Sequence, residues 1–159
     1  MMLDLDLSQH PQIEWRQWKW LLDQGVPLNT LMEMTQVRVV DGALAFYEAV
    51  SGDVVLWHPK TGQLESWLGN AFALGEDNIF NAGTYAFDNF LTVHSDPLDW
   101  LRGGGHGIVV LRWELAFDML RDATRIAVSE QLLPAYRQHM KPRRLPELAV
   151  LASEQRLAA

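Results

Sequence analysis

The sequence contains no cysteine among its 159 residues. A disulfide scaffold, a cysteine nucleophile and a cysteine-ligated zinc or iron–sulfur site are therefore excluded. Long hydrophobic runs are missing as well: a stretch such as 108–111 is far shorter than the roughly 20 residues that a membrane-spanning helix needs. The N-terminus lacks the basic start, apolar stretch and cleavage site of a signal peptide. We expect a cytoplasmic protein that makes no contact with a membrane.

Familiar catalytic motifs are also missing. No G-x-S-x-G, H-E-x-x-H or H-x-x-E-H pattern occurs. The glycine-rich stretch 103–107 is not followed by the Gly-Lys-Ser/Thr of a phosphate loop. It also precedes a predicted strand, whereas a phosphate loop opens a helix. We favour a flexible connector after a helix over a phosphate site, and we predict no cofactor.

Basic residues are absent from the middle of the chain. Residues 61–99 carry six acidic and no basic side chains, whereas residues 1–60 carry eight and four. Residues 100–159 carry six acidic and nine basic side chains, so the formal net charge of −7 combines −10 from residues 1–99 with +3 from residues 100–159. One hypothesis is therefore an acidic protein that binds a basic partner through 61–99.

Hydrophobic patterning and turn residues predict one α+β domain over 1–159. Residues 1–35 are predicted to form a helix pair (12–23 and 28–34). The next part, 37–90, holds an antiparallel meander (37–40, 43–49, 54–57 and 64–68), because Asp-Gly and Lys-Thr-Gly turns separate the apolar runs. Within it, 69–90 is either an irregular loop or further short strands.

Residues 91–151 are predicted to form a small βαβ-like half, followed by a frayed tail over 152–159. Parallel pairing through right-handed crossovers is expected there, because predicted strands alternate with predicted helices. Helices are predicted at 97–101, 114–122 and 130–140, and strands at 108–113, 125–128 and 148–151.

The first helix predicts an interface. At about 100° per residue, Trp15, Trp18 and Leu21 share one face, which we assign to the core. Ile13 and Trp20 fall on nearly the opposite face. Because exposed tryptophan is a frequent binding hot spot, Ile13 and Trp20 are our candidates for a protein partner or a second copy of the chain, and the other six tryptophans are predicted in the core.

Basic residues near the C-terminus suggest a second surface. Arg137, Lys141, Arg143 and Arg144 are candidates for contact with nucleic acid or an acidic partner. The alternative is that they are cations at the negative end of a helix, followed by a solvated loop.

A histidine and aspartate group gives a third possibility, a small metal- or phosphate-dependent enzyme. Imidazole and carboxylate side chains at His94, Asp96, Asp99 and His106 suit a divalent metal or acid–base chemistry. Each has a structural alternative: Asp96 is a good N-cap, and Asp99 lies in the first turn of the helix 97–101.

The stretches P-L-D-W-L (97–101) and G-I-V-V-L-R-W (107–113) resemble a segment of TOPRIM-type primase-like replication proteins of phages and mobile elements. Glu114 loosely matches the catalytic glutamate of that family. The family's catalytic Asp-x-Asp has no counterpart beyond residue 6. The resemblance implies an accessory module in phage or mobile-element DNA replication without the metal-binding catalytic set. Our leading expectation is therefore a non-catalytic binding or interaction domain.

Overall fold

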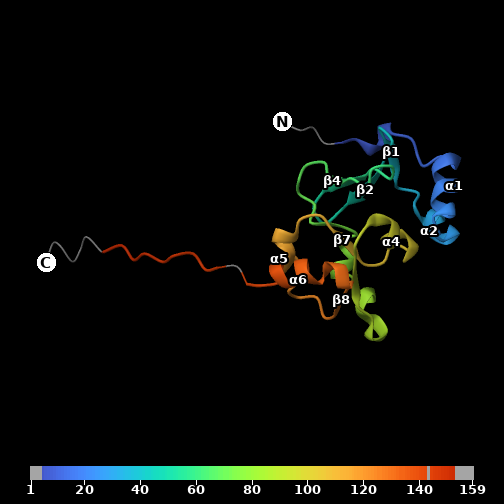
Figure 1. Ribbon diagram of the computed structural model, residues 1–159. Helices are drawn as coiled ribbons and strands as arrows, with labels where there is room; N and C mark the ends of the chain where they lie inside the picture. Colours follow the sequence, from blue (N-terminus) through green and yellow to red (C-terminus); the bar gives the residue numbers. More distant parts are fainter. Residues whose placement is uncertain (1–4, 143, 153–159) are drawn as a thin grey trace.

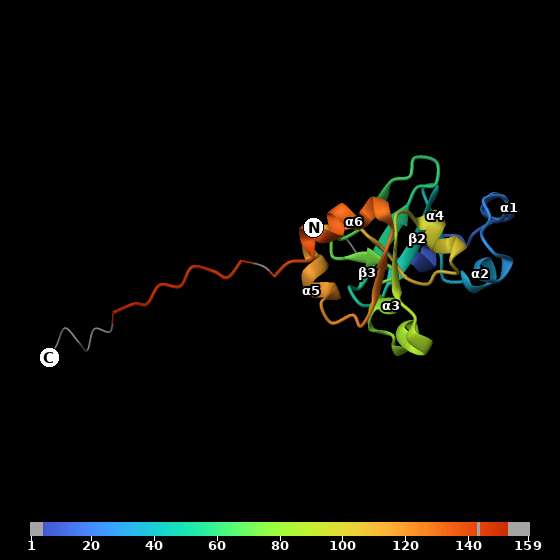
Figure 2. The ribbon, with the colours of Figure 1, turned by 60° about the horizontal axis from the view of Figure 1, so that its bottom comes forward.

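The computed structural model describes residues 5–142 and 144–152. It shows an α+β protein, as the sequence predicts, and two four-stranded sheets carry its core. The N-terminal helices lie at one end of the body and the last helices at the other, with the sheets between them (Figures 1 and 2). Among the described residues, no helix is long and apolar enough to cross a membrane.

The predicted N-terminal helix pair is present as α1 (Trp15–Asp23) and α2 (Leu28–Glu33), after a short 3₁₀ helix, η1 (Leu7–Gln9). Helix α1 begins three residues later than predicted, because the Gln17 side chain accepts a hydrogen bond from the Glu14 N–H (3.0 Å) and makes Glu14 the N-cap. Leu21 and Leu31 anchor the pair in the core, where both are almost fully buried.

The predicted meander is the first sheet, with strands β1 (Arg38–Val40), β2 (Ala43–Glu48), β3 (Asp53–Trp57) and β4 (Leu64–Ser66) in that order. All neighbours are antiparallel. The β1–β2 hairpin closes at Asp41 and Gly42, which both have positive φ (49° and 81°), as a two-residue turn of this kind requires.

Both faces of this sheet are covered, which explains the nearly continuous burial of β2 and β3. Leu44, Phe46 and Trp57 on one face pack in the main core with residues of α1, α2 and the second sheet. The opposite face packs against Leu5 and Leu7. Tyr47 is the one exposed residue of β2.

The second sheet has the order β5 (Ala73–Leu74), β7 (Ile108–Val110), β6 (Leu91–His94), β8 (Ile126–Val128). Strand β6 is parallel to both β7 and β8, and β5 is antiparallel to β7. Helix α4 (Pro97–Arg102) connects β6 to β7. The predicted parallel half is therefore present, with β6 as a central strand that we did not predict.

Short helices fill the remaining segments. The undecided stretch 69–90 contains β5, then α3 (Asp77–Phe80) and the 3₁₀ segment η2 (Ala82–Asp88). The predicted helix 114–122 is η3 (Trp113–Leu115) followed by α5 (Ala116–Leu120). The predicted helix 130–140 is η4 (Glu130–Leu132) followed by α6 (Leu133–His139).

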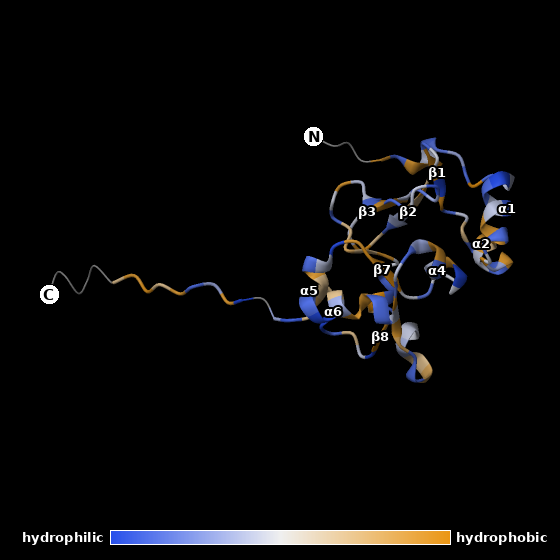
Figure 3. Cartoon of the chain, in the orientation of Figure 1, coloured by the Kyte–Doolittle hydropathy of each residue, from blue (hydrophilic) through white to orange (hydrophobic). Residues whose placement is uncertain are grey.

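The strand predicted over 148–151 is wrong. The chain leaves the body after α6 and runs away from both sheets, so no strand edge lies beside it (Figure 1). Leu148 is 86% and Leu151 is 91% exposed. The apolar residues of this tail, which are orange in Figure 3, are therefore exposed to solvent.

Candidate functional site

The glycine-rich connector between α4 and β7 is held by side chains through its carbonyl groups. The Trp100 indole Nε1 donates to the Gly107 carbonyl (2.9 Å). The Asn78 amide donates to the carbonyls of Gly105 (3.0 Å) and Gly107 (2.8 Å). A methyl group at Gly107 would lie 2.3 Å from the Thr92 carbonyl oxygen. These contacts favour the connector over the phosphate site.

Of the four residues of the enzyme alternative, His94 and His106 meet at the same connector, whereas Asp96 and Asp99 lie at the N-terminal end of α4. The His94 ring nitrogen Nε2 is 2.9 Å from the His106 carbonyl oxygen. Asp96 caps α4 by accepting from the Asp99 N–H (2.9 Å), and Asp99 pairs with Arg102 (3.0 Å). No group of three histidine, aspartate or glutamate side chains suited to a metal ion is found among residues 5–142 and 144–152. Each of these contacts has a structural use, and none assembles a metal site.

The basic candidates lie at the end of α6 and in the segment after it. Arg137 is exposed in the last turn of α6, and Lys141 and Arg144 are exposed beyond it. Arg143 lies outside the described residues. The position of Arg137 fits a cation at a helix C-terminus.

The two interface candidates have different surroundings. Ile13 precedes α1 and packs, half-buried, against the main core. Trp20 is 37% exposed, lies against Trp57 (ring centroids 6.3 Å apart) and lines a cavity of about 400 Å³. Trp15, which we assigned to the core, is 72% exposed. It is the first residue of α1, where a side chain extends past the packed part of the helix.

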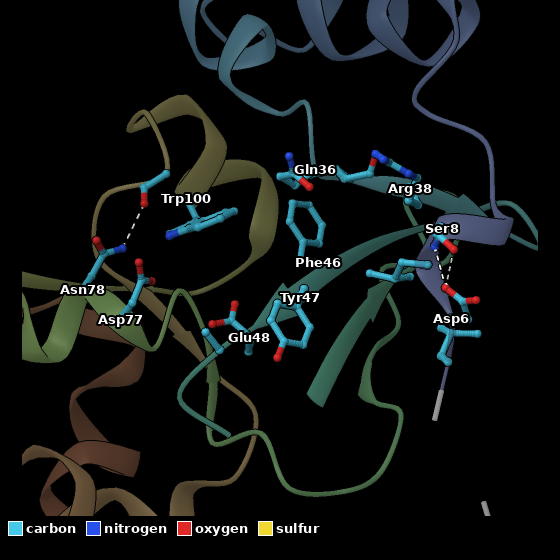
Figure 4. A pocket seen from close by; sticks show the side chains of 15 residues that line it. Asp6, Ser8, Gln36, Arg38, Phe46, Tyr47, Glu48, Asp77, Asn78 and Trp100 are labelled. Carbon is cyan, nitrogen blue, oxygen red and sulfur yellow. Dashed lines mark hydrogen bonds between the residues drawn. The ribbon is translucent and has the colours of Figure 1, made fainter. Parts of the chain in front are cut away.

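A second cavity, of about 730 Å³, lies beside the end of β2. We call it the β2 cleft. Figure 4 shows its side chains, which come from η1, the start of β1, the end of β2, the start of α3 and α4. Phe46 and Trp100 meet edge to face in its wall (ring centroids 5.7 Å apart, 81° between planes), and the exposed Tyr47 lies at its edge.

Carboxyl groups gather on one side of the β2 cleft. Glu48 is 5% exposed, and its two oxygens accept from the backbone N–H groups of Gly75 (2.7 Å) and Glu76 (3.1 Å). Burial raises the pKa of Glu48 to about 7, and the nearby Glu76 and Asp77 add to the effect although the two hydrogen bonds oppose it. Asp77 lines the cleft and is exposed to solvent.

No cation balances these acids within the described part of the chain. The ion pairs of the described residues include neither Glu48 nor Asp77. Arg38 is the one basic residue that lines the cleft. Its Nη1 donates instead to the backbone carbonyls of Thr35 (2.7 Å) and Val37 (3.2 Å). The cleft is therefore acidic on the Glu48 side.

The edge of β2 is open where it passes the cleft. Strand β1 pairs with β2 as far as Arg38 opposite Ala45, and the chain before Arg38 turns away, with the Val37 N–H bonded to Met34 (3.2 Å). Residues 46–48 pair with β3 alone. Beyond Ala45, no strand of the described part of the chain lies on the β1 side of β2.

The backbone of Tyr47 points to this open side. Val54, the residue opposite Tyr47 on β3, uses its carbonyl to bond Trp67 (2.8 Å) on the β4 side. In an antiparallel ladder the N–H and C=O of a residue point to the same side, and opposing residues alternate between bonded and non-bonded pairs. The backbone N–H and C=O of Tyr47 therefore point away from β3. No partner for its N–H or C=O is found among residues 5–142 and 144–152.

Sequence reasoning did not find the β2 cleft. The one available signal was a glutamate, Glu48, inside an otherwise apolar predicted strand. Neither a protein-family model, nor a curated protein, nor a solved structure matches this chain. The geometry of the described residues is therefore what supports a function.

Proposed function

We propose that this protein is a non-catalytic interaction domain that binds an extended segment of a partner protein along the open edge of β2. The observation that carries the proposal is the backbone of Tyr47, which has no partner among the described residues and lies in a cleft of about 730 Å³. An added strand would continue the line of β1 and bond to the N–H and C=O of Tyr47. Strand addition of this kind takes affinity from main-chain bonds and specificity from alternate side chains.

The charge of the cleft favours a partner protein over a second copy of the chain. If two copies paired symmetrically through β2, the same acidic patch would occur on both sides of the contact. Residues 43–48 of β2 contain no basic side chain, so a second copy paired through β2 would bring another acidic patch to the contact and no cation for Glu48 and Asp77. A segment of opposite charge would supply that cation.

The non-catalytic expectation is kept because the polar contacts of His94, Asp96 and Asp99 are structural. A link to phage or mobile-element replication stays a prediction that rests on residues 97–113. Contact with nucleic acid through Arg137, Lys141, Arg143 and Arg144 also stays a prediction.

An unbiased library of extended peptides, displayed to the purified protein, tests the proposal. A selected peptide is then resynthesised with a single N-methyl group at each position in turn. Because alternate residues of an added strand direct their N–H groups toward β2, N-methylation should weaken binding at the position bonded to Tyr47 and leave it unchanged at the two neighbouring positions. Loss at consecutive positions, or at none, would contradict strand addition.

Two substitutions at one position provide the matched protein control. Tyr47→Pro removes the N–H that faces the cleft, whereas Tyr47→Ala removes the ring and keeps the N–H. We expect Tyr47→Pro to abolish binding and Tyr47→Ala to retain it, with folding checked by thermal unfolding of each variant. Concentration-dependent self-association that Tyr47→Pro removes would show that a second copy occupies the cleft, and would overturn the proposal.

A further inference from the structure

The geometry of paired strands defines which residues lie beside the face of the added strand that points into the β2 cleft. Side chains alternate along a strand, so the residues on either side of the one bonded to Tyr47 lie on the same face as Phe46 and Glu48. Phe46 and Glu48 are buried on the side of the sheet that faces Trp100 and the β5–α3 turn. A side chain opposite Glu48 therefore enters the acidic side of the cleft.

Glu48 and Asp77 provide an acidic site that no described cation fills. Glu48 is buried between the two sheets, and Asp77 follows directly after the Gly75–Glu76 turn that Glu48 holds. Removing a carboxylate from water is costly unless an opposite charge or hydrogen bonds compensate. An incoming ammonium or guanidinium group would supply that charge, and it would form charge-assisted hydrogen bonds.

The remaining walls suit the stem of a long cationic side chain. Phe46 and Trp100 form an apolar surface beside the carboxyl groups (Figure 4). Lysine and arginine cover apolar surface with their methylene groups while the charged end reaches a polar partner.

We infer that the bound segment carries a lysine or arginine opposite Glu48, and that Glu48 and Asp77 bind its charged group. This inference rests on the proposed function, because it assumes a strand added at Tyr47. Asp77 binds the cation from the exposed side of the cleft, and Glu48 binds it from the buried side. The partner is thus a protein with an extended segment that contains a basic residue.

To test the inference, the basic residue of each peptide selected from the unbiased library is replaced by an uncharged one, and the affinity is measured again. Citrulline replaces arginine and norleucine replaces lysine, so that the aliphatic stem is kept and the charge is lost. We expect binding to weaken at least tenfold, about 1.4 kcal/mol at 25 °C. The selected peptides themselves should be enriched in lysine or arginine one position from a residue whose N-methylation abolishes binding.

Variants of the protein test whether Asp77 binds the basic side chain of the peptide. Asp77→Asn should weaken binding of the basic peptide several-fold, and Asp77→Lys should abolish it. Replacing the peptide's basic residue by glutamate should restore binding to Asp77→Lys. Glu130→Gln changes an exposed acid that does not line the cleft and should leave affinity unchanged. Asp77 is preferred to Glu48 here because Glu48 also holds the 75–76 turn.

The outcomes separate the inference from the proposed function. Peptides that show the alternating N-methyl pattern but bind equally with citrulline or norleucine would overturn the basic residue and keep strand addition. Peptides that need their charge but lose affinity equally with Asp77→Asn and Glu130→Gln would show long-range attraction in place of a site, and would also overturn the inference. If no peptide shows the alternating pattern, both the inference and the proposed function are wrong.

Discussion

Glu48 connects the two sheets through one carboxyl group. It belongs to β2 of the first sheet, and it accepts hydrogen bonds from the turn between β5 and α3 of the second sheet. Glu76, at that turn, is itself fully buried and accepts from the N–H groups of Phe72 and Ala73. The carboxyl groups of Glu48 and Glu76 thus both bond to backbone N–H groups of the segment 72–76, which directly precedes Asp77.

The raised pKa of Glu48 predicts a pH-dependent stability. Between its ordinary value of 4.5 and the folded value of about 7, the folded state holds a proton that the unfolded state has released. Stability therefore falls as the pH rises through this window, by about 3 kcal/mol in total for this one group. Glu48→Gln removes the titration. The difference in free energy of unfolding between the wild type and this variant should thus fall from pH 4.5 to pH 7.

Chemical denaturation at several pH values measures this difference, and the comparison of slopes removes the constant cost of the amide. Glu130→Gln, an exposed glutamate, serves as the control and should show no such trend. A difference between wild type and Glu48→Gln that stays constant between pH 4.5 and 7 would show that the carboxyl group titrates normally.

At the scale of elements, the connector between α4 and β7 positions the floor of the cleft. Trp100 and Asn78 both bind the carbonyl of Gly107, so the helix α4, the start of α3 and the strand β7 meet at one atom. The connector comes within van der Waals contact of β6 at Gly107. Glycine is needed there for two reasons, its φ of +85° and the space that a side chain would take.

A comparison of Gly107→Ala with Gly62→Ala separates the cost of the positive φ from the cost of the space that a side chain would take. Gly62 has a similar φ (+77°), but nothing lies within 4 Å of the place where its methyl group would be. We expect Gly62→Ala to cost about 1–2 kcal/mol of stability from backbone conformation alone. Gly107→Ala should cost about 1–3 kcal/mol more, because its methyl group meets the Thr92 carbonyl. Equal losses in thermal or urea unfolding would contradict the close approach.

The elements that the sequence predicts well are those with local signals. The Asp41-Gly42 turn and the alternation of apolar runs with turns predict the meander, and Asp96 with Pro97 predicts the start of α4. Strand β6 was missed because its four residues, which end at His94, follow the preceding loop without a turn signal that separates the two. Its strand character comes from pairing with β7 and β8, which a single sequence does not display.

The candidate site was harder to predict, since it depends on where β1 stops. Tyr47 is open because pairing ends at Arg38, and Glu48 reaches Gly75 across 27 positions in the chain. Neither fact has a local signal. The charge distribution did contain part of the answer: Asp77 belongs to the acidic stretch 61–99, for which a basic partner was one hypothesis.

At the scale of the molecule, the two sheets form the β2 cleft, whereas the chain after α6 takes no part in it. The sheets share a core and enclose the β2 cleft between their ends. The net negative charge lies in residues 1–99, which supply every acidic residue of the cleft. The tail after α6 lies outside this arrangement and exposes its apolar residues. A partner segment bound at β2 would therefore contact the acidic part of the molecule.

Amide hydrogen exchange at Tyr47, followed by NMR in the free protein and with a selected peptide, tests the central claim most directly. In the free protein the Tyr47 N–H should exchange much faster than those of Phe46 and Glu48, which face β3. The peptide should then slow the Tyr47 N–H while it leaves its two neighbours unchanged. A Tyr47 N–H that is protected in the free protein, or that stays fast when peptide is bound, would contradict the open edge on which the account rests.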